Sequence, residues 1–303
     1  MTPRNMVGYG ETPPDPHWPN GARVAVQFVI NYEEGGERTI VNGDAESESY
    51  LSEIVGTVSV EGKRDLNVES IYEYGSKAGF WRLHRLFQAF DIPVTVYGVT
   101  RALELNPDAV TAMKRAGWEI ASHGLRWIDY SALSEVEERD HLQKALAQHT
   151  AICGDRPVGW YTGRISENTR RLLVEEGGFL YDSDDYSDDL PYWNTEFGRP
   201  HLVIPYALDS NDFRFAMPQG FNSGTQFFDY LRDSFDYLYD EGATAPKLLN
   251  IGLHCRLTGR PGRAAALRKF LEHITAHEDV WICRRMDIAR HWHNNFYPAE
   301  TAS

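Results

Sequence analysis

The chain has 303 residues, of which 42% are apolar and 13% aromatic, so it can bury a large core in one barrel-sized domain or in two ordinary ones. Its formal charge of −14 at pH 7 argues against a nucleic-acid or anionic-membrane partner, because both require basic patches. The sequence has no signal-peptide pattern, no membrane-spanning stretch and three cysteines without a CxxC pair, so we expect a cytoplasmic protein.

Predicted strands and helices alternate along the sequence. Residues 24–30 (VAVQFVI) are typical of a buried strand of a parallel sheet. Further strands are expected at residues 93–98, 118–121, 157–161, 179–181, 247–253 and 280–283. Helices are expected at residues 80–90, 107–117, 134–150, 166–176, 223–241, 261–277 and 287–293, with capping boxes at Ser134/Glu137 and Ser223/Gln226. This alternation predicts one α/β domain over residues 1–303, a (β/α) barrel with an N-terminal arm at about residues 1–22.

Two adjacent acids, Glu33 and Glu34, follow the first predicted strand. Side chains alternate along an extended chain, so these carboxylates cannot simply share one face, and we expect them to do two different jobs in one pocket. A solvated loop after the strand is the alternative. Gly35 and Gly36 favour the functional reading, because glycine allows a tight turn or a close approach to a ligand.

Polar residues follow four later strands as well. They are His123, the turn from Tyr161 to Arg164, Asp182, and the pair His254 and Arg256. In a parallel barrel these positions meet Glu33 and Glu34 at one mouth. Each also has a structural alternative, since a lone histidine is commonly a hydrogen-bonded structural residue and an aspartate commonly forms a turn. Their repetition at one edge favours a site.

The motifs resemble those of the polysaccharide deacetylase (NodB-homology) superfamily, whose first motif is Thr-Phe-Asp-Asp-Gly and whose second carries two metal-binding histidines four residues apart. Here the first stands as residues 31–35 (NYEEG), and the second begins at His123. The resemblance implies that Glu33 is the general base, that Glu34 and His123 occupy metal-ligand positions, and that His254 is the general acid. Trp127 stands at the second histidine's position, and an indole offers no lone pair to a metal. Either another residue supplies the third ligand or the site works without metal.

Over residues 7–293 the chain resembles more specifically the metal-independent allantoinases of this superfamily. The phrases that carry this likeness are SIYEYGS, SHGLRWIDY, RPVGWYTGR, YDSDDYSDDLPYW, LVIPYALDSND and LHCRLTGRP. The resemblance implies hydrolysis of allantoin's hydantoin ring to allantoate in purine degradation, with a small cyclic ureide as substrate. It also implies a homotetramer and no metal cofactor; if a metal is bound, Glu34 and His123 are the fallback ligands.

We therefore expect Glu33, His123 and His254 to be catalytic, with the pKa of Glu33 raised toward neutrality by burial or by its acidic neighbour. The expected substrate-binding residues are Glu34, Trp127, Tyr161, Arg164, Arg256, Tyr74 and Asp182. Among these, Tyr74 is expected in a polar loop at residues 72–75 that approaches the site. For Trp127, simple core packing is an equally good interpretation.

Three alternatives remain at this stage. The first is a zinc-dependent polysaccharide or chitooligosaccharide deacetylase, which predicts an open groove and release of acetate. The second is a cyclic imidase of the same superfamily with a different ring substrate. The third is a barrel that has become a non-catalytic binding module, which an intact pair of Glu33 and His254 disfavours.

Overall fold

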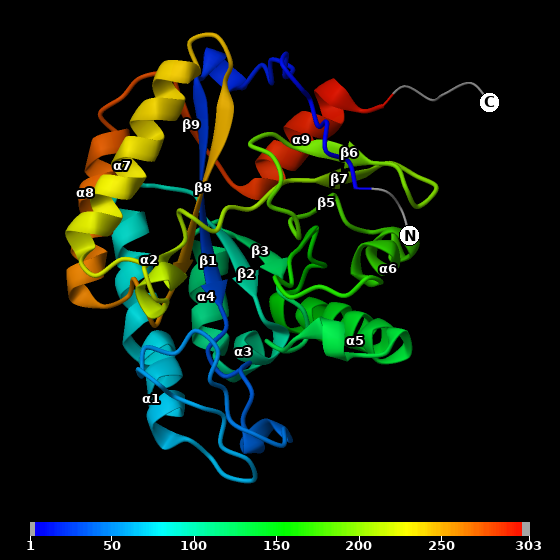
Figure 1. Cartoon of the computed structure of the whole chain (residues 1–303), viewed down its shortest axis with the longest axis vertical. Coiled ribbons are helices and arrows are strands. Elements are labelled where there is room, and N and C mark those ends of the chain that lie inside the picture. The colour runs from blue at the N-terminus through cyan, green and yellow to red at the C-terminus, as the bar shows by residue number, and fades with distance from the viewer. Residues whose placement is uncertain (1–3, 299–303) are drawn as a thin grey trace.

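A curled sheet of nine strands forms the centre of the computed structural model, which describes residues 4–298 (Figure 1). The strands follow the order β6-β7-β5-β4-β3-β2-β1-β8, and β9 pairs with the first part of β1. All pairings are parallel except that of β6 with β7. The strands are β1 (Val24–Tyr32), β2 (Thr95–Gly98), β3 (Glu119–Ser122), β4 (Gly159–Trp160), β5 (Tyr181–Asp182), β6 (Tyr192–Asn194), β7 (His201–Val203), β8 (Lys247–His254) and β9 (Val280–Ile282). The predicted (β/α) barrel is confirmed in a distorted form, as a half-barrel that curls from β6 round to β8.

Strand β1 lies next to the β8 end of this sheet, with β8 on one side and with β2 and β9 on the other. All nine of its residues are buried, which explains its continuous apolar run. Its register pairs Asn31 with His254 of β8 on one side and with Tyr97 of β2 on the other. The residues that follow β1 therefore emerge beside the carboxyl ends of β2 and β8, where α/β proteins place their ligands.

Helices cover the outside of the sheet. They are α1 (Leu66–Tyr74), α2 (Phe80–Ala89), α3 (Thr100–Leu105), α4 (Pro107–Arg115), α5 (Glu135–Cys153), α6 (Thr169–Glu176), α7 (Gly224–Glu241), α8 (Pro261–Ile274) and α9 (Arg285–Phe296). Figure 1 shows α7 and α8 side by side in the outer layer, where they pack against each other. None of the helices within residues 4–298 is both long enough and apolar enough to cross a membrane.

Local sequence signals explain several helix ends. The predicted capping box at Ser134 and Glu137 is confirmed in both directions. At Ser223 only half of the predicted box forms: its hydroxyl accepts from the backbone N–H of Gln226, whereas the Gln226 side chain accepts from Asn222. The helix expected from residue 166 begins at Thr169 and ends, as predicted, with Gly177 in the left-handed conformation.

The prediction of a polar loop at residues 72–75 is wrong. Asp65 caps the start of α1 by accepting from two backbone N–H groups, and α1 includes both Tyr72 and Tyr74. A π-helical turn at Gly75–Gly79 then connects α1 directly to α2. Such turns are rare and occur frequently at functional sites.

Candidate active site

A small cavity of about 100 Å³ opens at the carboxyl edge of the sheet. Its size is below the roughly 300–1,000 Å³ that is usual for drug-sized ligands, so it suits a compact molecule. Of the predicted site residues, it brings together Glu33, His123, Trp127, Tyr161, Arg164 and His254. The rest of the lining is Asn31, Tyr50, Leu51, Thr162, Gly163, Tyr186, Leu208, Asn211 and Phe213.

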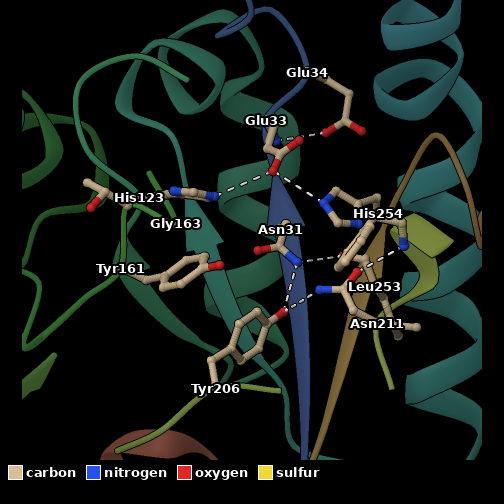
Figure 2. A network of polar contacts seen from close by, with 12 residues as sticks. Asn31, Glu33, Glu34, His123, Tyr161, Gly163, Tyr206, Asn211, Leu253 and His254 are labelled. Atoms are coloured by element: carbon tan, nitrogen blue, oxygen red, sulfur yellow. Dashed lines mark hydrogen bonds and ion pairs between the residues drawn. The ribbon is translucent and has the colours of Figure 1, made fainter. Parts of the chain in front are cut away.

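The carboxylate of Glu33 is the centre of the site and is 1% exposed. Its Oε1 lies 3.4 Å from Nε2 of His123 and 3.3 Å from Nε2 of His254. Figure 2 shows the two imidazoles approaching this carboxylate from opposite sides. Its Oε2 accepts a hydrogen bond of 2.6 Å from the buried guanidinium of Arg256. Both carboxylate oxygens of Glu33 thus have cationic or hydrogen-bonding partners.

These partners decide the charge of Glu33. Burial by itself would raise the pKa of this carboxyl, but Arg256, His254 and His123 together hold it well below its ordinary value. The predicted rise of the Glu33 pKa toward neutrality is therefore wrong. The reason is Arg256, which lies beneath the carboxylate instead of lining the cavity. Glu33 is ionised at neutral pH and can accept a proton.

His254 is held by a partner that the sequence did not reveal, Asp212. Oδ1 of Asp212 lies 2.6 Å from Nδ1 of His254, and Oδ2 accepts from the backbone N–H groups of His254 and Thr258. Burial would lower the pKa of His254, yet Glu33 and Asp212 raise it to about 9. His254 is therefore an imidazolium at neutral pH, with Nε2–H directed at the Glu33 carboxylate.

Asp212 reaches this position through an irregular segment. Asn211 forms an isolated parallel bridge with Gly252 of β8, and Asp212 begins the short 3₁₀ helix that follows. The only sequence signal is the phrase LVIPYALDSND, in which the acid follows a β-rich stretch. At the floor of the cavity, Asn31 donates to Tyr206 and to the carbonyl of Leu253, which ties the end of β1 to β8 (Figure 2).

Aromatic rings and one arginine form the wall opposite Glu33. The Arg164 guanidinium carbon lies 4.6 Å from the centre of the Trp127 ring and 5.1 Å from that of Tyr50. One of its terminal nitrogens has no hydrogen-bond partner within residues 4–298 although it is buried. An unpaired guanidinium N–H beside a cavity is a donor available to a ligand.

The turn that carries Arg164 is fixed by Asp184. Its carboxylate accepts from the backbone N–H of Thr162 at 3.0 Å and from that of Gly163 at 2.7 Å. Burial and the neighbouring Asp182 raise the pKa of Asp184 to about 7. Asp184 therefore positions the turn that carries Arg164, a role that the sequence analysis did not predict.

Glu34 does not join this cavity, so its predicted place beside Glu33 in one pocket is wrong. Figure 2 shows its side chain directed away from the two histidines. Its Oε2 accepts from the backbone N–H of Glu33, and it lines a separate cavity of about 260 Å³ with Glu37 and Tyr72. Alternation along the chain separates the two acids, as predicted, but it separates them into two cavities.

Three other predicted substrate-binding residues also lie outside the cavity. The Tyr74 hydroxyl donates to the carbonyl of Gly259 and accepts from Arg82, so it fastens α1 to the loop after β8. Asp182 is fully buried in ion pairs with Arg170 and His201, which lower its pKa despite its burial. Arg256 is 1% exposed and serves as the charge partner of Glu33. Long-range partners explain all three differences.

A curated relative decides the family. A protein of Schizosaccharomyces pombe named "Putative polysaccharide deacetylase" is 42% identical over 309 residues, which cover 95% of this chain and 96% of the relative. The chain belongs to the polysaccharide deacetylase family. The family model described as "Polysaccharide deacetylase" matches residues 63–177. The chain is thus an enzyme of the superfamily that includes these deacetylases and related hydrolases.

Two solved structures of this superfamily match almost the whole chain. The "Crystal structure of Puue Allantoinase" is 58% identical with a TM-score of 0.97, covering 99% of this chain and 100% of that one. The "Crystal structure of probable Polysaccharide deacetylase from Pseudomonas aeruginosa PAO1" is 57% identical with a TM-score of 0.96, covering 97% and 99%. Both likenesses confirm the deacetylase fold.

The donors at the deacetylase family's metal-ligand positions do not fit a catalytic zinc ion, which takes three protein ligands. Of these positions, only His123 presents a ligand atom beside Glu33. Trp127 offers no lone pair to a metal. The Glu34 carboxylate lines the other cavity, where it packs so closely against Gly75 that any side chain at position 75 would collide with it. Arg256 already supplies a fixed positive charge at Glu33.

Proposed function

We propose that this protein hydrolyses the hydantoin ring of allantoin to allantoate and that its own side chains, without a metal ion, activate the water. The observation that carries the proposal is the Glu33 carboxylate, which lies between two imidazoles and above a buried arginine. The likeness at 58% identity to a structure named as an allantoinase supports the choice of substrate. The small cavity also supports a compact ring over a sugar chain.

Glu33 acts as the general base. A water molecule between Glu33 and the ring carbonyl gives its proton to the carboxylate as its oxygen bonds to the carbonyl carbon. A well-placed base contributes typically about 10²–10⁴-fold to the rate. Because Arg256 keeps Glu33 ionised, the base is present in its active form throughout the neutral range.

His254 acts as the general acid. Its Nε2–H supplies a proton to the ring nitrogen as the bond between that nitrogen and the carbonyl carbon breaks. Asp212 holds Nδ1, so Nε2 faces the reaction and the imidazolium is stabilised until it releases the proton. The product is a single opened molecule that carries a carboxylic acid at one end and the freed N–H at the other, and the acid then loses its proton to solvent. The proton on Glu33 restores His254 through the contact between them.

Arg164 and His123 stabilise the oxygen that becomes negative when water adds. Both line the cavity, and Arg164 offers a buried N–H without a partner among the described residues. A single preorganised donor of this kind is typically worth about 2.7–4 kcal/mol in the transition state. Trp127 and Tyr161 provide flat walls against a planar ring.

The test is a substrate comparison with purified protein, in which allantoate formation from allantoin and acetate release from N-acetylglucosamine oligomers are measured in parallel. We expect allantoate only, and we expect Glu33→Gln to form it about 10³–10⁴-fold more slowly. Release of acetate without turnover of allantoin would favour the deacetylase activity that the name of the Schizosaccharomyces pombe relative describes. Turnover of another cyclic imide in preference to allantoin would retain the chemistry but overturn the substrate.

A further inference from the structure

A second group of ligand-type side chains lies on the outer helical layer, where α7 meets α8. Asp236 comes from α7, His273 from the last turn of α8, and His277 from the turn that follows. The ligand atoms of these three residues all lie within 4.8 Å of one another, and within residues 4–298 no other group of three or more histidine, cysteine or acidic side chains does so. We propose that it binds a divalent transition-metal ion of the zinc type.

The backbone places the two imidazoles side by side. His277 lies three residues beyond the end of α8, and the turn after the helix brings its ring centre to 4.8 Å from that of His273. Nδ1 of His277 lies 2.9 Å from the carbonyl oxygen of His273. Because a carbonyl can only accept, Nδ1 carries the hydrogen, and Nε2 keeps the lone pair that a metal requires.

Asp236 supplies the third ligand across the helix interface. Its Oδ1 lies 2.6 Å from Nε2 of His273, so a proton now occupies the position between them that a metal ion would take. The rings of Phe235 and Tyr239 pack against the imidazoles, which limits their movement and partly excludes water. The site is therefore oriented before any ion arrives.

The donor set indicates which metals fit. Two imidazole nitrogens and one carboxylate oxygen match the ligands of Zn²⁺, with a fourth position left for water. Ni²⁺ and Cu²⁺ use the same donors, whereas Mg²⁺ and Ca²⁺ prefer oxygen ligands. A bound ion would link α7 to α8 and stabilise the folded chain by mass action.

This site is independent of the proposed hydrolysis. None of the residues that line the Glu33 cavity comes from α7 or α8. Zinc measured in a preparation of this protein would therefore report on the helix pair and carry no information about the water that attacks the substrate. The zinc site and the proposed hydrolysis can therefore be tested independently.

The experiment is a titration of the full chain with ZnCl₂ in the presence of a chromophoric chelator, for wild type and the variants His277→Ala, Asp236→Asn, His17→Ala and His123→Ala. We expect one tight zinc ion per chain, with affinity reduced at least tenfold in His277→Ala and in Asp236→Asn. His17→Ala is the matched control, because His17 is an exposed imidazole that also contacts an aspartate, and it should bind zinc like wild type.

Zinc should also raise the melting temperature of wild type and of His17→Ala, and raise that of His277→Ala much less. Allantoin turnover should be unchanged in His277→Ala. Equal zinc affinity in wild type and His277→Ala would overturn the proposal. Displacement of the bound zinc by millimolar Mg²⁺ would overturn it as well. A change in zinc affinity caused only by His123→Ala would move the site to the active centre and would also contradict it.

Discussion

Glu33 and Glu34 are neighbours in the sequence, yet their surroundings are opposite. Glu33 is enclosed by Arg256 and two histidines, which hold its pKa well below the ordinary value against the effect of burial. Burial and the charge of Glu33 raise the pKa of Glu34 to about 7, although Arg256 opposes this, and its Oε1 has no partner among the described residues. Two identical acids therefore differ in pKa because their surroundings differ: Glu33 contacts cationic groups, whereas Glu34 is buried with few partners.

The largest effect expected from this comparison is the loss of Glu33. We expect Glu33→Gln to lower kcat for allantoin by about 10³–10⁴-fold, because the amide cannot accept the proton of the attacking water. Glu34→Gln is the matched control at the adjacent position, and its kcat should stay within about threefold of wild type. Steady-state kinetics on both variants measures this contrast. Similar losses in the two variants would place both acids in the reaction.

The next largest effect concerns the partner of His254. We expect Asp212→Asn to lower kcat by about 10²-fold, since Asp212 orients the imidazole and stabilises its charged form. The alkaline limb of the pH profile should also move down toward the ordinary value for histidine. Asp209→Asn, in the same segment but exposed, is the control. A loss of kcat without any shift of the pH profile would reduce Asp212 to a structural role.

The pH dependence of wild type should show the two environments directly. With the pKa of His254 raised to about 9, the acid is protonated below that pH and is lost as pH rises through it. We expect kcat/KM to be flat through neutrality and to fall about tenfold per pH unit above roughly pH 9. Glu33 remains ionised, so kcat/KM should show no acidic limb near pH 7. A limb between pH 6 and 7 would contradict the assignment of the pKa values.

The smallest expected effect on catalysis, but one visible in stability, belongs to Glu34. Its folded-state pKa is raised from 4.5 to about 7, so its contribution is fully present below about pH 4.5 and is lost as pH rises through 7. The total loss is at most about 3 kcal/mol. We expect Glu34→Gln to flatten this part of the stability curve. Urea unfolding of both proteins at pH 5 and pH 8 measures it, and equal pH dependence would refute the raised pKa.

Much of the site was predictable because parallel strands end at one edge. That rule brought Glu33, His123 and His254 together from sequence positions far apart, since β1, β3 and β8 are parallel. The position of Trp127 was also informative, because the resemblance implies a metal ligand there and an indole offers no lone pair to a metal. Local apolar runs and caps predicted most of the sheet and most of the long helices.

The remaining features depended on contacts that no local pattern encodes. Asp212 lies in an irregular segment without periodicity, and only the bridge of Asn211 to β8 places it beside His254. The burial of Arg256 under Glu33 and the ion pairs of Asp182 join residues that are distant in sequence. Strands β6 and β7 have three residues each, too few to show an alternation.

The most direct test of the central claim is allantoin turnover by protein that has been treated with a chelator and shown to contain no metal by elemental analysis. The His277→Ala variant should be assayed beside wild type, so that zinc on the outer helices does not confuse the result. We predict full allantoate formation in both metal-free proteins and a rate about 10³–10⁴-fold lower in Glu33→Gln. Loss of activity on metal removal, with recovery when zinc is returned, would contradict the account.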